Sequence, residues 1–304
     1  MAEKRIDEPT GTETVGHEWD GIEELDTPMP RWWVYTFYAT ILFAIAYCVV
    51  YPAIPLLNKG TEGQWGWTSR GQLAAEKTQG DAIHAKVRAE LANVPVEQLQ
   101  SNPELMAAAV AGGRAAFRVN CVQCHGSAAA GSKGYPNLND DDWLWGGDLK
   151  TIETTLLHGV RSPDDMETRQ SQMPSFGRDG ILTAEQVGQV ASHVLSLSGK
   201  APANAAGAAT FAANCAVCHG TDGKGNRAVG APNLTDAIWL YGGTKADIVA
   251  SVTNAHGGVM PAWGKRLDPV TIKMLAAYVH SLGGGEDFAP AATVPAAPAQ
   301  GVAK

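Results

Sequence analysis

Two stretches of this 304-residue chain are nearly identical: Asn120–Gly126 reads NCVQCHG, and Asn214–Gly220 reads NCAVCHG. Each holds two cysteines separated by two residues and a histidine directly after the second one. Four of the chain's five cysteines lie here. A bare C-x-x-C pair is typical of a zinc half-site or a redox dithiol, whereas C-x-x-C-H is the attachment signature of c-type haem. A zinc site would need further ligands nearby, and neither copy has another cysteine.

The spacing suits the chemistry of a porphyrin. Two thiols on one short turn can form thioethers with its two vinyl groups, and the adjacent histidine then lies beneath the iron. We therefore predict two covalently bound haem c groups. The predicted attachment residues are Cys121, Cys124, Cys215 and Cys218, and the predicted proximal iron ligands are His125 and His219.

A haem iron that moves electrons without binding oxygen needs a sixth ligand, and methionine is the choice of cytochromes c. Met173 in MPSFG and Met260 in MPAWG each follow a motif by forty-odd residues, although the two gaps differ in length. Both share the pattern M-P-x-aromatic-G, which makes them the candidates. The remaining methionines and histidines considered are interpreted as packing or surface residues: Met106, Met166, Met274, His158, His193, His256 and His280.

The repeat extends beyond the ligands. Gly113 and Phe117 precede the first motif at the same offset at which Gly207 and Phe211 precede the second. After each motif comes a Pro-Asn-Leu triplet, and then WLWGG in one copy and WLYGG in the other. The chain therefore contains a duplicated module.

Each module ends in a predicted amphipathic helix. Thr183 and Gln186 form a capping-box signal before the first, and Asp268 with Pro269 forms an N-cap signal before the second. Both helices carry apolar residues at i, i+3, i+4 and i+7, the spacing of a half-buried helix. A glycine and an aromatic residue before the motif, together with this helix, suggest two helices that cross closely over a haem edge.

The modules resemble class I cytochrome c domains, which are all-α folds built around the haem. The resemblance implies that His125 pairs with Met173 and that His219 pairs with Met260 as axial ligands. It also suggests that the carbonyls of Pro136 and Pro232 accept a hydrogen bond from the proximal imidazoles.

The N-terminal part contains a candidate membrane span. Trp32 to Tyr51 are twenty consecutive uncharged, mostly apolar residues, with aromatic residues at both ends and Pro52 directly after them. A signal peptide fits poorly, because an acidic stretch precedes the segment and no small-residue cleavage site follows it. The expected segments are an acidic cytoplasmic tail (1–31), a transmembrane anchor (32–57), a membrane-proximal linker or helix (58–105), two haem modules (106–199 and 200–283) and a flexible tail (284–304).

The basic residues that flank the span do not choose an orientation, but the haems do. Thioether attachment takes place outside the bacterial cytoplasmic membrane, so we expect periplasmic haem modules and a cytoplasmic N-terminus on a single-pass inner-membrane protein. The net charge of −8 argues against a nucleic-acid partner.

The whole arrangement resembles a known family. DGIEELDTPMPRWW runs directly into the single span, and GWTSRGQ and two C-x-x-C-H modules follow. These features are similar to the dihaem subunit (CcoP or FixP, subunit III) of cbb3-type cytochrome c oxidase. The resemblance implies a subunit that is not an enzyme on its own. It would accept electrons from a cytochrome c-type donor and pass them through the monohaem subunit to the catalytic haem–copper subunit.

Two other functions stay open on the residues alone. One is a free membrane-anchored dihaem electron shuttle. The other is a dihaem peroxidase, which would need one iron with an open or displaceable site, whereas both modules carry a candidate methionine.

Overall fold

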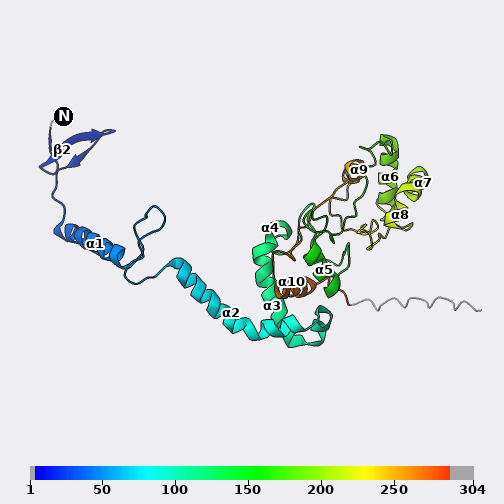
Figure 1. Cartoon of the computed structure of the whole chain (residues 1–304). Helices are drawn as coiled ribbons and strands as arrows, with labels where there is room; N and C mark the ends of the chain where they lie inside the picture. Colours follow the sequence, from blue (N-terminus) through cyan, green and yellow to red (C-terminus); the bar gives the residue numbers. More distant parts are fainter. Residues whose placement is uncertain (1–3, 288–304) are drawn as a thin grey trace, which may run out of the picture. The chain divides into compact units, whose positions relative to one another are not determined.

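The computed structural model describes residues 4–287 and comprises two units, Met1–Ile83 and His84–Lys304. The described chain is mostly helical (Figure 1), which confirms the predicted all-α class with one small sheet as an exception. The predicted flexible tail, 284–304, lies mainly outside the described residues. Its first part is held in place, because Glu286 forms an ion pair with Arg227 (2.7 Å).

The predicted acidic tail contains a three-stranded antiparallel sheet, in the order β1 (Ile6–Asp7), β2 (Thr12–Trp19) and β3 (Ile22–Leu25). Asp20 and Gly21 join β2 to β3 with φ of 50° and 86°. Positive φ at both positions defines the turn that matches strand twist in a two-residue hairpin, and Asp-Gly is a preferred pair for it. The Asp20-Gly21 pair is thus a hairpin signal in the sequence, although no strand was predicted there.

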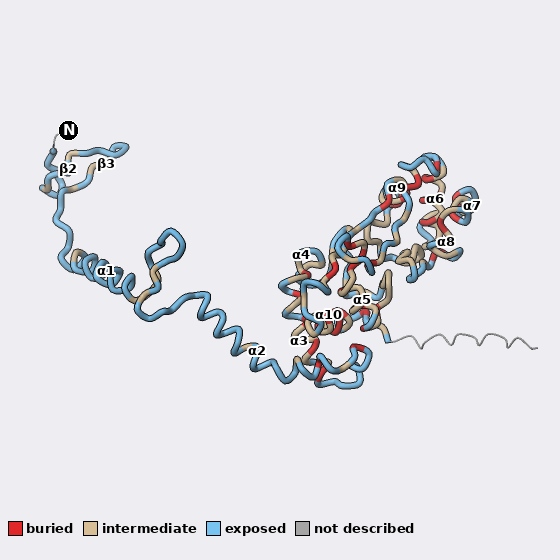
Figure 2. The backbone as a smooth tube through the Cα atoms, viewed as in Figure 1, coloured by how far each residue is buried: buried red, intermediate tan, exposed pale blue. Residues whose placement is uncertain are grey.

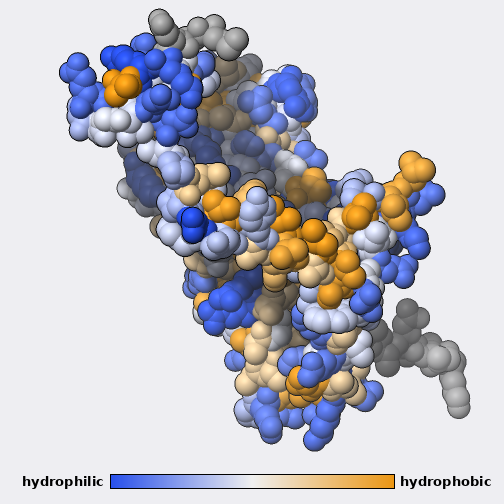
Figure 3. Space-filling view, turned by 90° about the vertical axis from the view of Figure 1, so that its left-hand side faces the viewer, coloured by the Kyte–Doolittle hydropathy of each residue, from blue (hydrophilic) through white to orange (hydrophobic). Residues whose placement is uncertain are grey.

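Helix α1 (Arg31–Val50) coincides with the predicted span to within one residue, and its apolar side chains are exposed (Figure 2). It starts after Pro30 and ends before Pro52. Hydrophobic side chains also gather in a band on the face shown in Figure 3. At the C-terminal end of α1, Tyr51 stacks on Tyr47 with ring centroids 4.6 Å apart. Length and composition allow α1 to cross a membrane.

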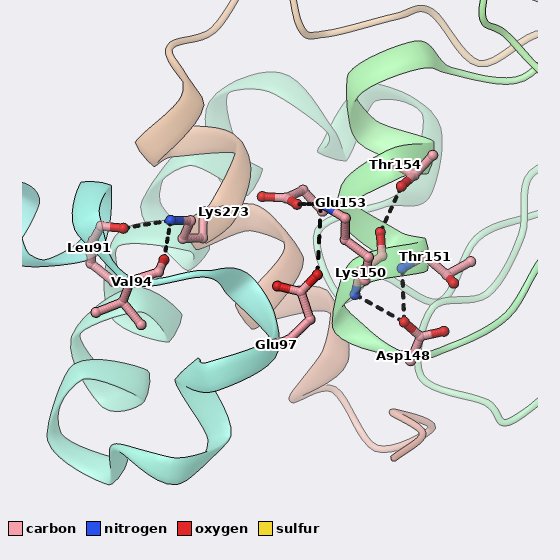
Figure 4. Close-up of polar contacts among 9 residues, drawn as sticks. All are labelled: Leu91, Val94, Glu97, Asp148, Lys150, Thr151, Glu153, Thr154 and Lys273. Atoms are coloured by element: carbon pink, nitrogen blue, oxygen red, sulfur yellow. Dashed lines mark hydrogen bonds and ion pairs between the residues drawn. The ribbon is translucent and has the colours of Figure 1, made fainter. Parts of the chain in front are cut away.

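Helix α2 (Ser69–Asn93) and the 3₁₀ helix η1 (Val96–Ser101) follow. The C-terminal part of the predicted linker, 58–105, therefore lies in helices that pack within the second unit. Leu91, Val96 and Leu99 are buried in one cluster with side chains from three helices of the second unit. Lys273 donates to the carbonyls of Leu91 (2.6 Å) and Val94, where the unpaired carbonyls of a helix end favour a cation (Figure 4).

The first haem body, as we define it, consists of four helices and the loop at 126–148. The helices are α3 (Pro103–Asn120), α4 (Val122–His125), α5 (Leu149–His158) and α10 (Pro269–His280). Its core joins Phe117 and Ile152 to Ile272 and Leu275 of α10. Each buried aliphatic side chain of this size contributes about 1.5–3 kcal/mol. Helices α3 and α10 cross at Gly113, where a Cβ atom would lie 2.0 Å from the Met274 carbonyl oxygen.

The second haem body also consists of four helices. They are α6 (Ala184–Leu197), α7 (Ala205–Asn214), α8 (Ala216–His219) and α9 (Lys245–Asn254). Val187, Val190 and Val194 of α6 pack against Phe211 of α7. The two helices cross at Gly207, where a Cβ atom would lie 2.1 Å from the Gln189 carbonyl oxygen. The predicted close crossing of helices is therefore present in both bodies.

The helices pack in exchanged pairs between the predicted modules 106–199 and 200–283, whose bounds stay a prediction. Helix α10 closes the body of the first motif, and α6 closes the body of the second. The chain leaves the first body after Val160 and returns to it at Met260, and these two residues pair as an antiparallel bridge. Periodicity could not reveal this exchange, because both closing helices present the same kind of apolar stripe and both partner helices offer the same glycine and phenylalanine.

Candidate haem sites

Each proximal histidine is the last residue of a one-turn helix. A glycine follows it with positive φ, 77° at Gly126 and 78° at Gly220, which ends the helix. Nδ1 of His125 lies 3.1 Å from the carbonyl oxygen of Pro136. The carbonyl oxygen accepts the Nδ1 proton, and Nε2 then has a free lone pair for a metal.

The second motif has the same geometry, since Nδ1 of His219 lies 3.1 Å from the carbonyl oxygen of Pro232. Burial lowers the pKa of both His125 and His219, and the bond to the proline carbonyl opposes that shift. Burial therefore favours the neutral imidazole, which is the form that binds iron, and the hydrogen bond orients the ring. The carbonyl acceptors implied by the cytochrome c resemblance are confirmed.

The two cysteines of each motif differ in burial. Cys121 and Cys215 are buried, and Cys124 and Cys218 are exposed. Burial raises the pKa of Cys121 and of Cys215 to about 11. Each motif therefore directs one thiol into a core and the other to its edge.

Each candidate methionine packs against the motif that lies farther away in the sequence. Met260 packs against the cluster that contains Cys121 and Phe117. Met173 packs against the cluster that contains Cys215 and Phe211. The expected pairs, His125 with Met173 and His219 with Met260, stay predictions, and this packing favours the exchanged pairs.

The backbone holds the Met260 loop tightly against α5. Val160 N–H donates to the Met260 carbonyl (3.0 Å), and Met260 N–H donates to the Val160 carbonyl (3.0 Å). Gly159 permits this approach, because its φ is 67° and a Cβ there would lie 2.2 Å from the Met260 carbonyl oxygen. Trp263 N–H adds a third bond, to the Leu156 carbonyl (2.9 Å).

The Met173 loop is attached to α9 differently. Ser175 Oγ donates to the Asn254 carbonyl (2.8 Å), and Arg178 N–H donates to the Thr253 carbonyl (2.9 Å). Ala255 occupies the position that corresponds to Gly159, with φ of 56°. Within residues 4–287, no backbone hydrogen bond joins Met173 to the end of α9.

A buried polar atom tests whether a haem fits these residues. The indole N–H of Trp239 is buried without a partner in the described part of the chain, and Trp239 packs against the core of the second body. A buried N–H without an acceptor costs about 1–3 kcal/mol, so such a group normally binds something. Haem propionates are acceptors of the right kind. Together with two thiols, an oriented imidazole and a thioether, this donor set fits haem c.

The other histidines and methionines behave as packing or surface residues. His256 stacks on Tyr241 with ring centroids 3.9 Å apart, and His158 contacts Asp165 (3.2 Å). Met274 is buried in the cluster formed with α2, and Met166 is 98% exposed.

Comparison with known proteins gives matches along most of the chain. Family models match residues 11–58 (N-terminal domain of cytochrome oxidase-cbb3, FixP), 110–198 (cytochrome c) and 202–279 (cytochrome c oxidase, cbb3-type, subunit III). The cbb3-type cytochrome c oxidase subunit FixP of Azorhizobium caulinodans is 54% identical over 285 residues, 92% of this chain and 96% of that protein. Subunit CcoP of Cereibacter sphaeroides is 53% identical over 276 residues, 90% and 95% of the two chains.

The chain belongs to the FixP/CcoP family. Members of the FixP/CcoP family carry cytochrome c domains, so the two predicted haem c groups are confirmed as cofactors. The chain is an electron-transfer cytochrome and not an enzyme on its own, which leaves the peroxidase without support. The apolar helix and the match to the FixP N-terminal domain make it a membrane-anchored protein.

Proposed function

We propose that this chain is the electron-entry subunit of a cbb3-type terminal oxidase. It accepts electrons from a cytochrome c-type donor on the periplasmic side and passes them through the monohaem subunit to the catalytic haem–copper subunit. The observation that carries the proposal is the family N-terminal domain, which precedes two interlocked haem bodies in one chain. A free shuttle needs no such domain.

We propose exchanged axial pairs for the two irons: His125 with Met260, and His219 with Met173. The packing of each methionine against the other motif's core supports this assignment. When bound, haem c supplies an iron that changes between the ferrous and ferric states. The protein holds the imidazole through the proline carbonyl. The thioether would then complete the iron's ligands, and a thioether ligand favours the ferrous state.

The interlocking of the bodies supports electron transfer between them. Gly134 N–H donates to the Leu240 carbonyl (2.9 Å), and Lys133 forms an ion pair with Asp247 (2.7 Å). The exchange also gives each haem site residues from both sequence repeats. The two sites therefore keep a fixed relation during turnover, which a tether of separate domains would not provide.

The proposed topology places residues 1–30 in the cytoplasm and the haem bodies in the periplasm. In spheroplasts, a tag at the N-terminus should resist added protease while the haem bodies are cleaved. Cleavage of the tag with protection of the haem bodies would reverse the assignment.

The test of the subunit role uses the full chain and two variants in membranes that have no other oxidase. One variant carries a cleavable secretory signal peptide in place of residues 1–57, and the other replaces α1 with an unrelated transmembrane helix of equal length. We expect both to bind haem, accept electrons from a reduced donor cytochrome, and lose most oxygen reduction. If the helix replacement respires at the normal rate and the chain purifies alone in mild detergent, the free shuttle replaces the subunit role.

A further inference from the structure

One face of the N-terminal sheet is apolar and exposed. Ile6 pairs with Glu13 and Trp19 pairs with Ile22, and both pairs lie on the face opposite Thr14. Ile6 is 61%, Trp19 63% and Ile22 69% exposed. We call these three side chains the apolar face. Large exposed apolar side chains that share one face mark an interaction surface rather than a core.

The charge around the apolar face is strongly acidic. Residues 1–31 contain nine acidic and three basic residues. Two of the basic residues form ion pairs with acidic residues of the same segment. Lys4 pairs with Asp26 (2.8 Å), and Arg5 pairs with Glu23 (2.8 Å). Glu24, which lies on the same face as Ile22, forms no ion pair within residues 4–287. The surface therefore presents apolar side chains within a negative rim.

The tether keeps this surface close to the membrane. Five residues, Asp26–Pro30, separate β3 from α1, and two of them are prolines. Extended proline-rich chain spans about 3.1 Å per residue, so the sheet lies within roughly 15–20 Å of the start of the helix. Any occupant of the apolar face must therefore lie at the membrane surface.

Two kinds of partner lie at the membrane surface, the lipid leaflet and the loops of membrane proteins, and their charges differ. The cytoplasmic leaflet is negative and repels an acidic surface. The cytoplasmic loops of multi-span membrane proteins are enriched in lysine and arginine, so they attract an acidic surface. We propose that the apolar face and its acidic rim dock onto the basic cytoplasmic loops of a multi-span membrane protein. This inference rests on the cytoplasmic N-terminus of the proposed function.

The experiment places a photoreactive benzoylphenylalanine at position 19 of the full chain and irradiates native membranes. The matched control carries the same group at Glu18, which is exposed on the opposite face of β2. We expect position 19, and not position 18, to crosslink to a multi-span protein that co-purifies with this chain. The crosslinked peptide, identified by mass spectrometry, should lie in a lysine- or arginine-rich loop. Crosslinks to lipid alone, to an acidic loop, or equally from both positions would overturn the proposal.

A charge variant sharpens the result. Glu24 lies on the same face as Ile22, so Glu24→Lys should reduce the yield at position 19 at least threefold, while Glu18→Lys leaves it within a factor of about two. Equal yields would refute charge complementarity. The spheroplast protease assay on the same variants separates the two proposals. A protected tag without crosslinks refutes only the docking, whereas a cleaved tag refutes the orientation and the docking together.

Discussion

The two haem bodies derive from one repeat, yet they hold their candidate methionines by different means. In the first body, Gly159 allows two backbone hydrogen bonds between Val160 and Met260. In the second, Ala255 stands at the corresponding position, and a serine hydroxyl supplies the nearest bond. The first body is also supported by α2 and η1 through their buried cluster. The comparison teaches that a duplicated site can keep the same candidate ligands while the hydrogen bonds that hold their loops differ.

Exchanged ligation predicts which haem responds to each methionine. In a chain that lacks the second haem through Cys215→Ala and Cys218→Ala, Met260→His should lower the potential of the remaining haem. Imidazole favours ferrous iron less than thioether does, and axial ligands set potentials over about 0.8 V, so a decrease on the order of 0.1–0.2 V is expected by redox titration.

The matched control is Met173→His in the same background, which should leave that potential unchanged. The reciprocal pair, in a chain without the first haem, should show the reverse dependence. If Met173→His shifts the potential in the chain that lacks the second haem, the axial pairs are His125 with Met173 and His219 with Met260.

Gly159→Ala should disrupt the two backbone hydrogen bonds that hold the Met260 loop in the first body. The new Cβ would lie 2.2 Å from the Met260 carbonyl oxygen, in a backbone conformation that side chains rarely adopt. Strain of this kind costs about 1–3 kcal/mol, before the displaced loop is counted. We expect a lower Tm and loss of the methionine–iron charge-transfer band from one ferric haem. Gly188→Ala, at an open position of α6, should leave the band unchanged and raise the Tm slightly, because alanine favours a helix over glycine.

Ala255→Gly should sharpen the comparison from the other side. Ala255 has φ of 56° and ψ of 175°, a region that is almost exclusive to glycine. Relief of this strain outweighs the greater chain entropy of glycine, so stabilisation by about 1 kcal/mol is expected. Denaturant unfolding measures the change. A loss of stability would show that the alanine methyl group contributes packing that exceeds its strain.

Much of each site could be predicted because its chemistry is local. The C-x-x-C-H motifs, the M-P loops and the caps at Thr183 and Asp268 are written in a few adjacent residues, and each cap forms as expected. The pairing of the halves is a long-range choice between two nearly equal partners, and no short pattern encodes it. Gly159 differs from its counterpart Ala255 and so hints at the exchanged packing. Its role is understood only once the structure shows its close contact with Met260.

The smallest expected effect concerns Asp142, whose counterpart in the second repeat is Ile238. Burial raises the pKa of the half-buried Asp142 to about 6, and Asp236, Asp140 and Asp141 add to the rise while Arg227 opposes it. The folded state therefore binds this proton more tightly than the unfolded chain, in which the aspartate has its ordinary pKa of 3.8.

Linkage then gives the sign of the pH dependence. Stability from this group is highest below pH 3.8, declines as the pH rises, and is fully lost above about pH 6. Asp142→Asn should remove that decline and raise stability at pH 7, by less than about 1 kcal/mol because water screens a half-exposed carboxylate. Thermal unfolding from pH 4 to 7 measures both effects, with Asp141→Asn as the exposed control. If the two variants follow the same pH profile, Asp142 is not the aspartate that distinguishes the first repeat from the second.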